Sequence, residues 1–196
     1  MVNYRIGYHD AAASARTIDL LPGDDGVRIE WRTEINRNVS STGKYENVVQ
    51  NTLRFITFEA YFKEAAFHKL ETFMSFAQQG QPFSFTKNPA KGSETLNGAV
   101  STGDNSLIAS ATVTGFEVGD FIILRDTEGL TWDVCEVEAI ADTTITLVDP
   151  ITHDYDDGTS IFWYYDFPAL YLIDEKFDPD RDGDYWNHTF NCVEVR

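Results

Sequence analysis

The sequence predicts a mainly β protein with one α-helix, built as a β-sandwich that is interrupted by a small inserted β-barrel. Three observations predict this fold. Apolar and polar residues alternate along several segments, as in half-buried strands. A single segment has helical spacing. Aromatic residues, which favour strands, make up 14% of the 196 residues, and the 42% of hydrophobic residues is enough for a core.

The N-terminal third is expected to be a set of strands. Residues 27–35 alternate without interruption, with Ile29 and Trp31 on one face and Arg28 and Glu30 on the other. Residues 22–26 (PGDDG) have the composition of a turn that precedes this strand. Residues 53–62 are apolar in places on both faces, which predicts a central strand. The polar residues around 36–44 predict the tip of a long hairpin between the two.

The predicted helix spans about residues 63–79. Ala66, Phe67, Leu70, Phe73 and Met74 recur at spacings of three and four, with charged residues between them. Gly80 follows as a stop signal. We expect the aromatic stripe of this helix to belong to the core, and residues 82–85 to begin another strand.

Turn-rich residues 87–100 indicate a boundary, and short strands separated by turns follow between residues 106 and 148. From residue 160 the aromatic strands of the first region return, ending in an alternating segment at 186–195. The predicted organisation is a sandwich of residues 1–90 and 160–196, with residues 91–159 as an inserted acidic barrel.

Charge is unevenly distributed along the chain. The net charge is −17; residues 1–90 carry 10 basic and 10 acidic side chains, whereas residues 91–165 carry 2 and 14. Sequence-independent binding to nucleic acid needs a basic surface, so this function is disfavoured. Solubility through self-repulsion remains the simplest reason for the acidic residues.

The two cysteines, Cys135 and Cys192, do not make a disulfide framework and lie in strand-like segments, where buried thiols are common. No segment has the apolar run of a signal peptide or the roughly 18–20 apolar residues of a membrane span. We expect a soluble protein made in a cytoplasm.

No pattern in the sequence predicts a catalytic site or a cofactor. The four histidines, His9, His68, His153 and His188, are not spaced as a metal pair. Nucleophile elbows, phosphate-binding loops and dinucleotide fingerprints are missing from the sequence. The chain is therefore expected not to be an enzyme, although neighbouring carboxylates leave that reading open.

The strongest local motif is an aspartate-rich segment near the C-terminus. It has the start of a calcium-binding loop, with a glycine at Gly183, but Thr189 replaces the expected glutamate at position 12. The alternative is a polar hairpin turn. The candidate ligands are Asp178, Asp180, Asp182 and Asp184. For a second acidic segment, residues 153–158, the favoured interpretation is a loop tip. A weak cation site or a partner-binding patch is the alternative.

The order of these segments resembles the tail-tube-like proteins of tailed bacteriophages, and most closely the distal tail proteins of long-tailed phages. The segments that carry the resemblance are VRIEWRTEI (27–35), LRFITFEAYF (53–62), the helix with the aromatic strand after it, FWYYDFPALYLIDEKF (162–177) and YWNHTFNCVEV (185–195). The insert resembles small barrels of the oligonucleotide/oligosaccharide-binding type.

This resemblance implies a structural virion component at the phage tail tip. It implies a homohexameric ring that joins the tail tube protein to the baseplate hub protein, with a central channel through which DNA passes without specific binding, and no membrane partner. The hairpin around 36–44 could pair with a neighbouring subunit. The aromatic residues 162–167 and Tyr171 could form an interface, or simply the core within one chain.

Two other functions remain open. The first is another phage tail protein of similar fold, such as a tube subunit or a terminator. The second is a carbohydrate-binding β module that uses Trp132, Trp163, Tyr164 or Trp186 as a stacking platform.

Overall fold

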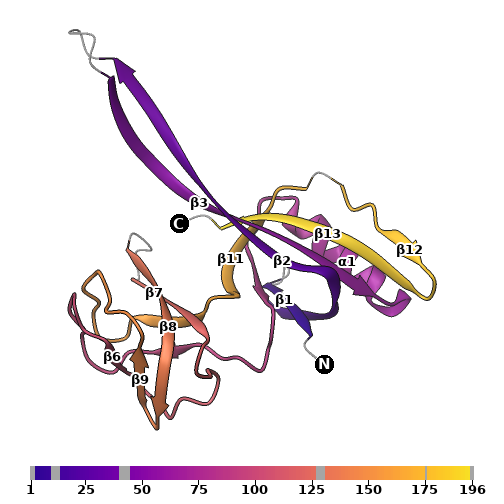
Figure 1. Ribbon diagram of the computed structural model, residues 1–196. Coiled ribbons are helices and arrows are strands. Elements are labelled where there is room, and N and C mark those ends of the chain that lie inside the picture. The colour runs from indigo at the N-terminus through magenta and orange to yellow at the C-terminus, as the bar shows by residue number, and fades with distance from the viewer. Residues whose placement is uncertain (1–2, 10–13, 40–44, 127–130, 175, 195–196) are drawn as a thin grey trace. The chain divides into compact units, whose positions relative to one another are not determined.

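The computed structural model describes residues 3–9, 14–39, 45–126, 131–174 and 176–194. The chain divides into two compact units, the first made of residues 1–87 and 167–195 and the second of residues 88–166. The predicted fold class is confirmed: the described chain is mainly β with a single helix, and it contains a closed six-stranded barrel and a half-barrel sheet (Figure 1).

The first unit is built on a seven-stranded sheet with the order β11-β4-β1-β2-β3-β13-β12. Strand β11 also pairs with β13, so the sheet curls back on itself. The strands are β1 (Tyr4–His9), β2 (Ala15–Val39), β3 (Tyr45–Phe62), β4 (Phe83–Thr86), β11 (Asp166–Leu172), β12 (Asp180–Asp182) and β13 (Tyr185–Glu194).

An aromatic core fills this unit. Phe58 of β3 stacks between Phe85 and Phe190, with ring centres 3.9 Å and 4.8 Å away. These side chains come from strands far apart in the sequence, so their burial holds the sheet in its curled form. Every second residue of β3 from Ile56 to Phe62 is buried, as alternation requires for one covered face.

The helix α1 (Glu64–Ala77) covers that face. Its buried residues are Leu70, Phe73, Met74 and Ala77, and the Phe73 ring packs 4.9 Å from Phe83. The helix ends close to the predicted position, and Gly80 follows with φ 76°, a conformation that glycine adopts without strain.

Residues 22–26 do not form the predicted turn between strands. They are a bulge within the continuous strand β2: Pro22 lies opposite Ala60, and Val27 lies opposite Phe58. The extra residues of β2 therefore loop out over β3. Gly23 permits this close approach, because a β-carbon there would lie 2.6 Å from the Glu59 side chain.

The second unit is a small barrel with the strand order β5-β10-β7-β8-β9-β6. A backbone bridge between Leu96 and Ala109 brings the two ends of this order together. Its core includes Leu107, Ile122 and Ile161. The strands are β5 (Glu94–Thr95), β6 (Ser106–Ile108), β7 (Phe121–Arg125), β8 (Trp132–Ala141), β9 (Thr144–Leu147) and β10 (Ser160–Trp163).

The predicted boundary at residue 160 is wrong. Residues 160–163 form β10, which pairs with β5 and β7, so they belong to the barrel and not to the sandwich. Their aromatic composition resembles that of the first unit, which explains the error. The two cysteines are free and buried, Cys135 in the barrel and Cys192 in the sheet of the first unit.

Candidate functional site

Strands β2 and β3 continue as a two-stranded hairpin beyond their neighbours in the sheet (Figure 1). Strand β1 pairs with β2 only from Ala15 to Leu20, and β13 pairs with β3 only as far as Arg54. Beyond these points β2 and β3 pair only with each other among the described strands, up to Val39 opposite Tyr45. The backbone N–H and C=O groups on both outer edges of this hairpin are therefore available to pair with a further strand. Of the predicted hairpin tip, residues 36–44, residues 36–39 belong to strand β2, and residues 40–44 lie outside the described residues.

A buried ion pair lies at the base of the hairpin. Arg54 and Glu194 are opposite each other in the β3–β13 ladder, with exposed fractions of 1% and 2% and 3.4 Å between Nε and Oε2. The guanidinium carbon lies 4.2 Å from the ring centre of Phe167 and 5.6 Å from that of Trp31. The carboxylate and the aromatic faces compensate for the lost hydration of the guanidinium. This cluster fixes the place where the hairpin leaves the sheet.

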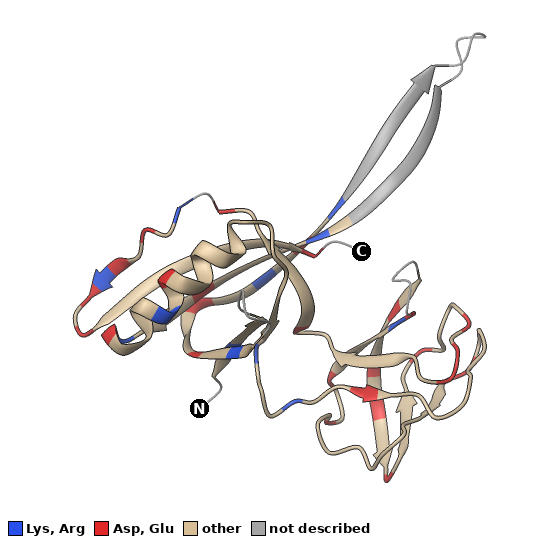
Figure 2. Cartoon of the chain, turned by 180° about the vertical axis from the view of Figure 1, so that it is seen from behind, with Lys and Arg blue, Asp and Glu red and all other residues tan. Residues whose placement is uncertain are grey.

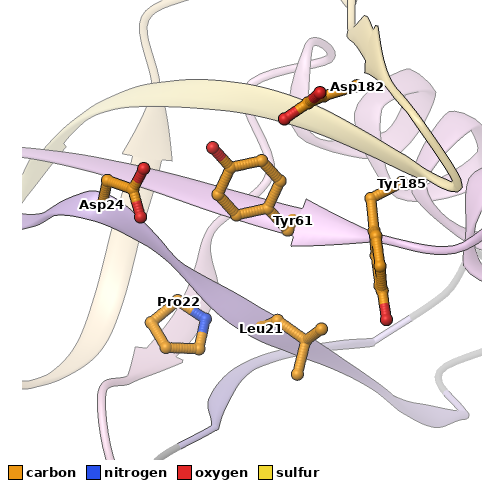
Figure 3. A pocket seen from close by; sticks show the side chains of 6 residues that line it. All are labelled: Leu21, Pro22, Asp24, Tyr61, Asp182 and Tyr185. Carbon is orange, nitrogen blue, oxygen red and sulfur yellow. The ribbon is translucent and has the colours of Figure 1, made fainter.

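The bulge in β2 forms one wall of a pocket of about 440 Å³ (Figure 3). Strand β3 contributes Tyr61, and the β12–β13 turn contributes the opposite wall. Two tyrosine rings, two carboxylates and two apolar side chains face the same space. The lining residues are Leu21, Pro22, Asp24, Tyr61, Asp182 and Tyr185.

The aspartate-rich segment forms the hairpin turn that was the alternative to a calcium loop. Asp180 pairs with Asn187 and Asp182 with Tyr185, and Gly183 has φ 59° at the first central position of the turn. An extended strand spaces its carboxylates along its length instead of around one ion. No three His, Cys, Asp or Glu side chains lie close enough to hold a metal ion in the described part of the chain. The described segment is a hairpin turn, and Asp178, Asp180, Asp182 and Asp184 are not gathered around one point in it.

Asp133 of the barrel anchors a loop by hydrogen bonds. Its carboxylate accepts bonds from the backbone N–H groups of Thr152 and His153, at 2.9 and 3.1 Å, and from the hydroxyl groups of Thr152 and Tyr155, and it lies 3.3 Å from Nδ1 of the His153 ring. Burial alone would raise the pKa of Asp133, but these bonds from Thr152 and His153 outweigh it and lower the pKa. The arrangement stabilises a charged carboxylate and needs no ligand.

The acidic segment 153–158 is a loop, as expected, and two of its carboxylates are engaged within the barrel. Asp154 accepts hydrogen bonds from the backbone N–H and the hydroxyl of Thr102, at 2.7 and 3.0 Å. Asp157 accepts a bond from the Gly98 N–H at 2.7 Å. These aspartates connect two loops, which is sufficient reason for their position.

The four aromatic residues considered for a stacking platform do not come together. Trp132 and Tyr164 lie half-buried on the outer face of the barrel, where Phe121 and Val134 are 46% and 38% exposed. Trp163 instead points into the barrel core.

Trp186 belongs to the other unit. There its ring packs 5.0 Å from Phe67 and its indole N–H donates to Glu64 at 2.9 Å. Among the aromatic residues considered for an interface, Trp163 and Phe167 are buried within the chain, while Phe162, Tyr164 and Tyr171 are half-buried.

The histidines occupy separate environments. His68 is exposed on the helix and lies 2.9 Å from Glu71, and His153 contacts Asp133 at 3.3 Å. His188 packs edge-on against the rings of Phe177 and Phe190, and its burial lowers its pKa.

No protein family that we searched matches the chain, and no curated protein is significantly similar to it. Within the part of the chain that is described, no helix is long and apolar enough to cross a membrane.

Sequence reasoning missed the buried pair and the pocket. Arg54 is the only charged residue in the apolar run of residues 53–58, and a lone charge in such a run is a usable signal for a buried ion pair. Its partner Glu194 and the pocket residues carry no comparable signal, because only long-range strand pairing brings them together.

Proposed function

We propose that this chain is a structural component of a bacteriophage tail, a distal tail protein whose six copies form a ring between the tail tube and the baseplate hub. The observation that carries the proposal is the β2–β3 hairpin, whose outer edges have no neighbouring strand among the described residues. An isolated two-stranded hairpin is only marginally stable in water, so a further strand is needed to stabilise it.

Ring assembly provides such a strand. If each hairpin pairs with the sheet of the next copy, the contact joins two different surfaces and repeats around a closed ring. The buried Arg54–Glu194 pair supports this role, since it holds the hairpin in a defined direction at its base. A tube subunit or a terminator of similar fold would use the same geometry.

The charge of the chain suits a channel that DNA traverses without binding. The net charge is −17, and Lys and Arg are sparse in the second unit (Figure 2). Carboxylates repel the phosphate backbone, so they lower the affinity for DNA at every position. The proposed role is structural, and it needs no catalytic group, cofactor or membrane contact.

Light scattering of the purified protein over a concentration series tests the ring. We expect a species near six times the chain mass of 22.2 kDa, alone or after addition of tail tube and hub proteins, and a ring in electron micrographs. A monomer at every concentration, with and without these proteins, would contradict the proposal.

A second candidate function is carbohydrate binding on the outer face of the barrel. Phe121 is exposed there, with its ring centre 6.4 Å from that of Tyr164, and the exposed Val134 and half-buried Trp132 lie further along the same face. Sugar rings stack on such aromatic faces. Calorimetric titration with cell-wall oligosaccharides tests this function. Trp132→Ala should abolish binding, and Trp186→Ala, in the other unit, should not.

A further inference from the structure

The pocket of the first unit combines aromatic, apolar and acidic walls. Figure 3 shows the Tyr61 ring between the carboxylates of Asp24 and Asp182, with the Tyr185 ring at one side and Leu21 and Pro22 below. The bulge in β2 is what brings Asp24 over Tyr61, because a regular strand would keep these residues in line. The three segments come together only in the folded sheet.

The polar groups of this lining mainly accept hydrogen bonds. As far as the lining is described, its polar side chains are two carboxylates and two tyrosine hydroxyls. The Tyr61 hydroxyl is hydrogen-bonded to Asn187. A ligand that binds here must therefore bring donors of its own, and an anionic ligand would meet two negative charges.

The charged side chains in the lining, Asp24 and Asp182, are both acidic. The hydrogen bond to Asn187 would lower the pKa of Tyr61, but desolvation and the charges of Asp24, Glu59 and Asp182 raise it. The Lys63 ammonium, which is not part of the lining, lies 5.5 Å from the centre of the Tyr185 ring. The nearby Arg181 is engaged with the Gly183 carbonyl and the Trp186 ring.

We propose that this pocket binds an organic cation on an apolar stem, as presented by an arginine or lysine side chain. The cationic head donates hydrogen bonds to Asp24 and Asp182 and lies against the tyrosine rings. The methylene stem lies on Leu21 and Pro22. The volume of about 440 Å³ exceeds what one such side chain needs and lies in the range of small-ligand sites.

The same chemistry has two sources, a basic side chain of a protein partner or a free polyamine. The inference does not depend on the proposed ring, because every lining residue belongs to one copy of the chain.

Titration of the full chain, followed by nuclear magnetic resonance of the tyrosine ring protons, tests the proposal. The probes are N-acetyl-arginine amide, spermidine and the neutral N-acetyl-citrulline amide, which matches arginine in shape. We expect saturable shifts of Tyr61 and Tyr185 with the cations and none with citrulline. Tighter binding of spermidine indicates a polyamine, and tighter binding of N-acetyl-arginine amide indicates a basic side chain of a protein partner.

Matched variants separate direct contact from overall charge. Asp24→Asn keeps the shape of an exposed bulge residue and should weaken cation binding at least about tenfold, since it removes a charged acceptor. Asp25→Asn removes the same charge from the next residue, outside the lining, and should change binding less than about threefold.

Three outcomes overturn the proposal. The first is binding of N-acetyl-citrulline amide as tight as that of the cations. The second is an equal loss of binding in Asp24→Asn and Asp25→Asn. The third is no shift with any cation up to about 10 mM, well above the ~1 mM dissociation constant of a weak complex. An unchanged thermal transition shows that the variants are folded.

Discussion

Arg54 and Glu194 face each other across β3 and β13 as an almost completely buried ion pair. Removal of one partner leaves the other charge without compensation in a site that water does not reach. We expect Arg54→Met or Glu194→Leu alone to lower the free energy of unfolding by roughly 3–5 kcal/mol. The double variant Arg54→Met/Glu194→Leu should recover most of this loss. Denaturant unfolding of the four proteins measures the coupling, and additive losses would contradict the pair.

The β2–β3 hairpin should be dispensable for folding and necessary for assembly. Thr33 and Thr52 lie opposite each other, so an Asn-Gly turn can replace residues 34–51 and close the shortened strands. The sheet below them keeps its pairing. We expect a similar thermal transition and the loss of any species larger than a monomer in light scattering. A ring of unchanged subunit number would show that another surface drives assembly.

His188 should make stability depend on pH. Burial lowers its pKa below the ordinary value of 6.5, against the opposing charges of Asp174, Asp178 and Asp180. The unfolded chain therefore binds the proton more readily than the folded one, so stability is complete above pH ~6.5 and decreases as the pH falls below it. Unfolding measured between pH 7.5 and 5 should show this decrease.

The variant His188→Gln should flatten that pH dependence, whereas His68→Gln, at an exposed position of the helix, should leave it unchanged. An identical slope in the wild-type protein and His188→Gln would assign the dependence to other groups.

Asp133 should hold the loop of residues 150–155 in the barrel. Asp133→Asn keeps the size of the side chain but removes the charge that accepts the N–H groups of Thr152 and His153. We expect a loss of about 1–3 kcal/mol and faster amide hydrogen exchange at these two residues. Because the pKa of Asp133 is lowered, its contribution is present above the ordinary value of 3.8 and disappears as the pH falls below it. Unchanged exchange would contradict this role.

Periodicity predicted the elements whose burial repeats regularly. The helix at Glu64–Ala77 and the strand β8 were predictable because one face of each is covered and the other is wet. The position of the aromatic segment 160–167 was not predictable, because the segment is apolar on both faces and does not show which face belongs to the core. Trp163 points into the barrel and Tyr164 lies on its outer face.

The bulge of β2 also escaped prediction. Residues 22–26 have turn composition, and whether such a segment ends a strand or bulges out of it depends on the strand opposite. Here the Glu59 side chain occupies the space that a β-carbon at position 23 would need, so glycine is required there. The two residues are far apart in the sequence. The pocket depends on that bulge, so its residues could not be grouped from the sequence.

The second unit begins and ends at neighbouring strands. Its first strand β5 pairs with its last strand β10, and in the first unit β4, before the insertion, lies next to β11, after it. The barrel can therefore be cut out or exchanged for another domain at two adjacent points without breaking a strand pairing in the host sheet. An exchange at these two points would replace the whole barrel while the core of the first unit and the hairpin stay the same.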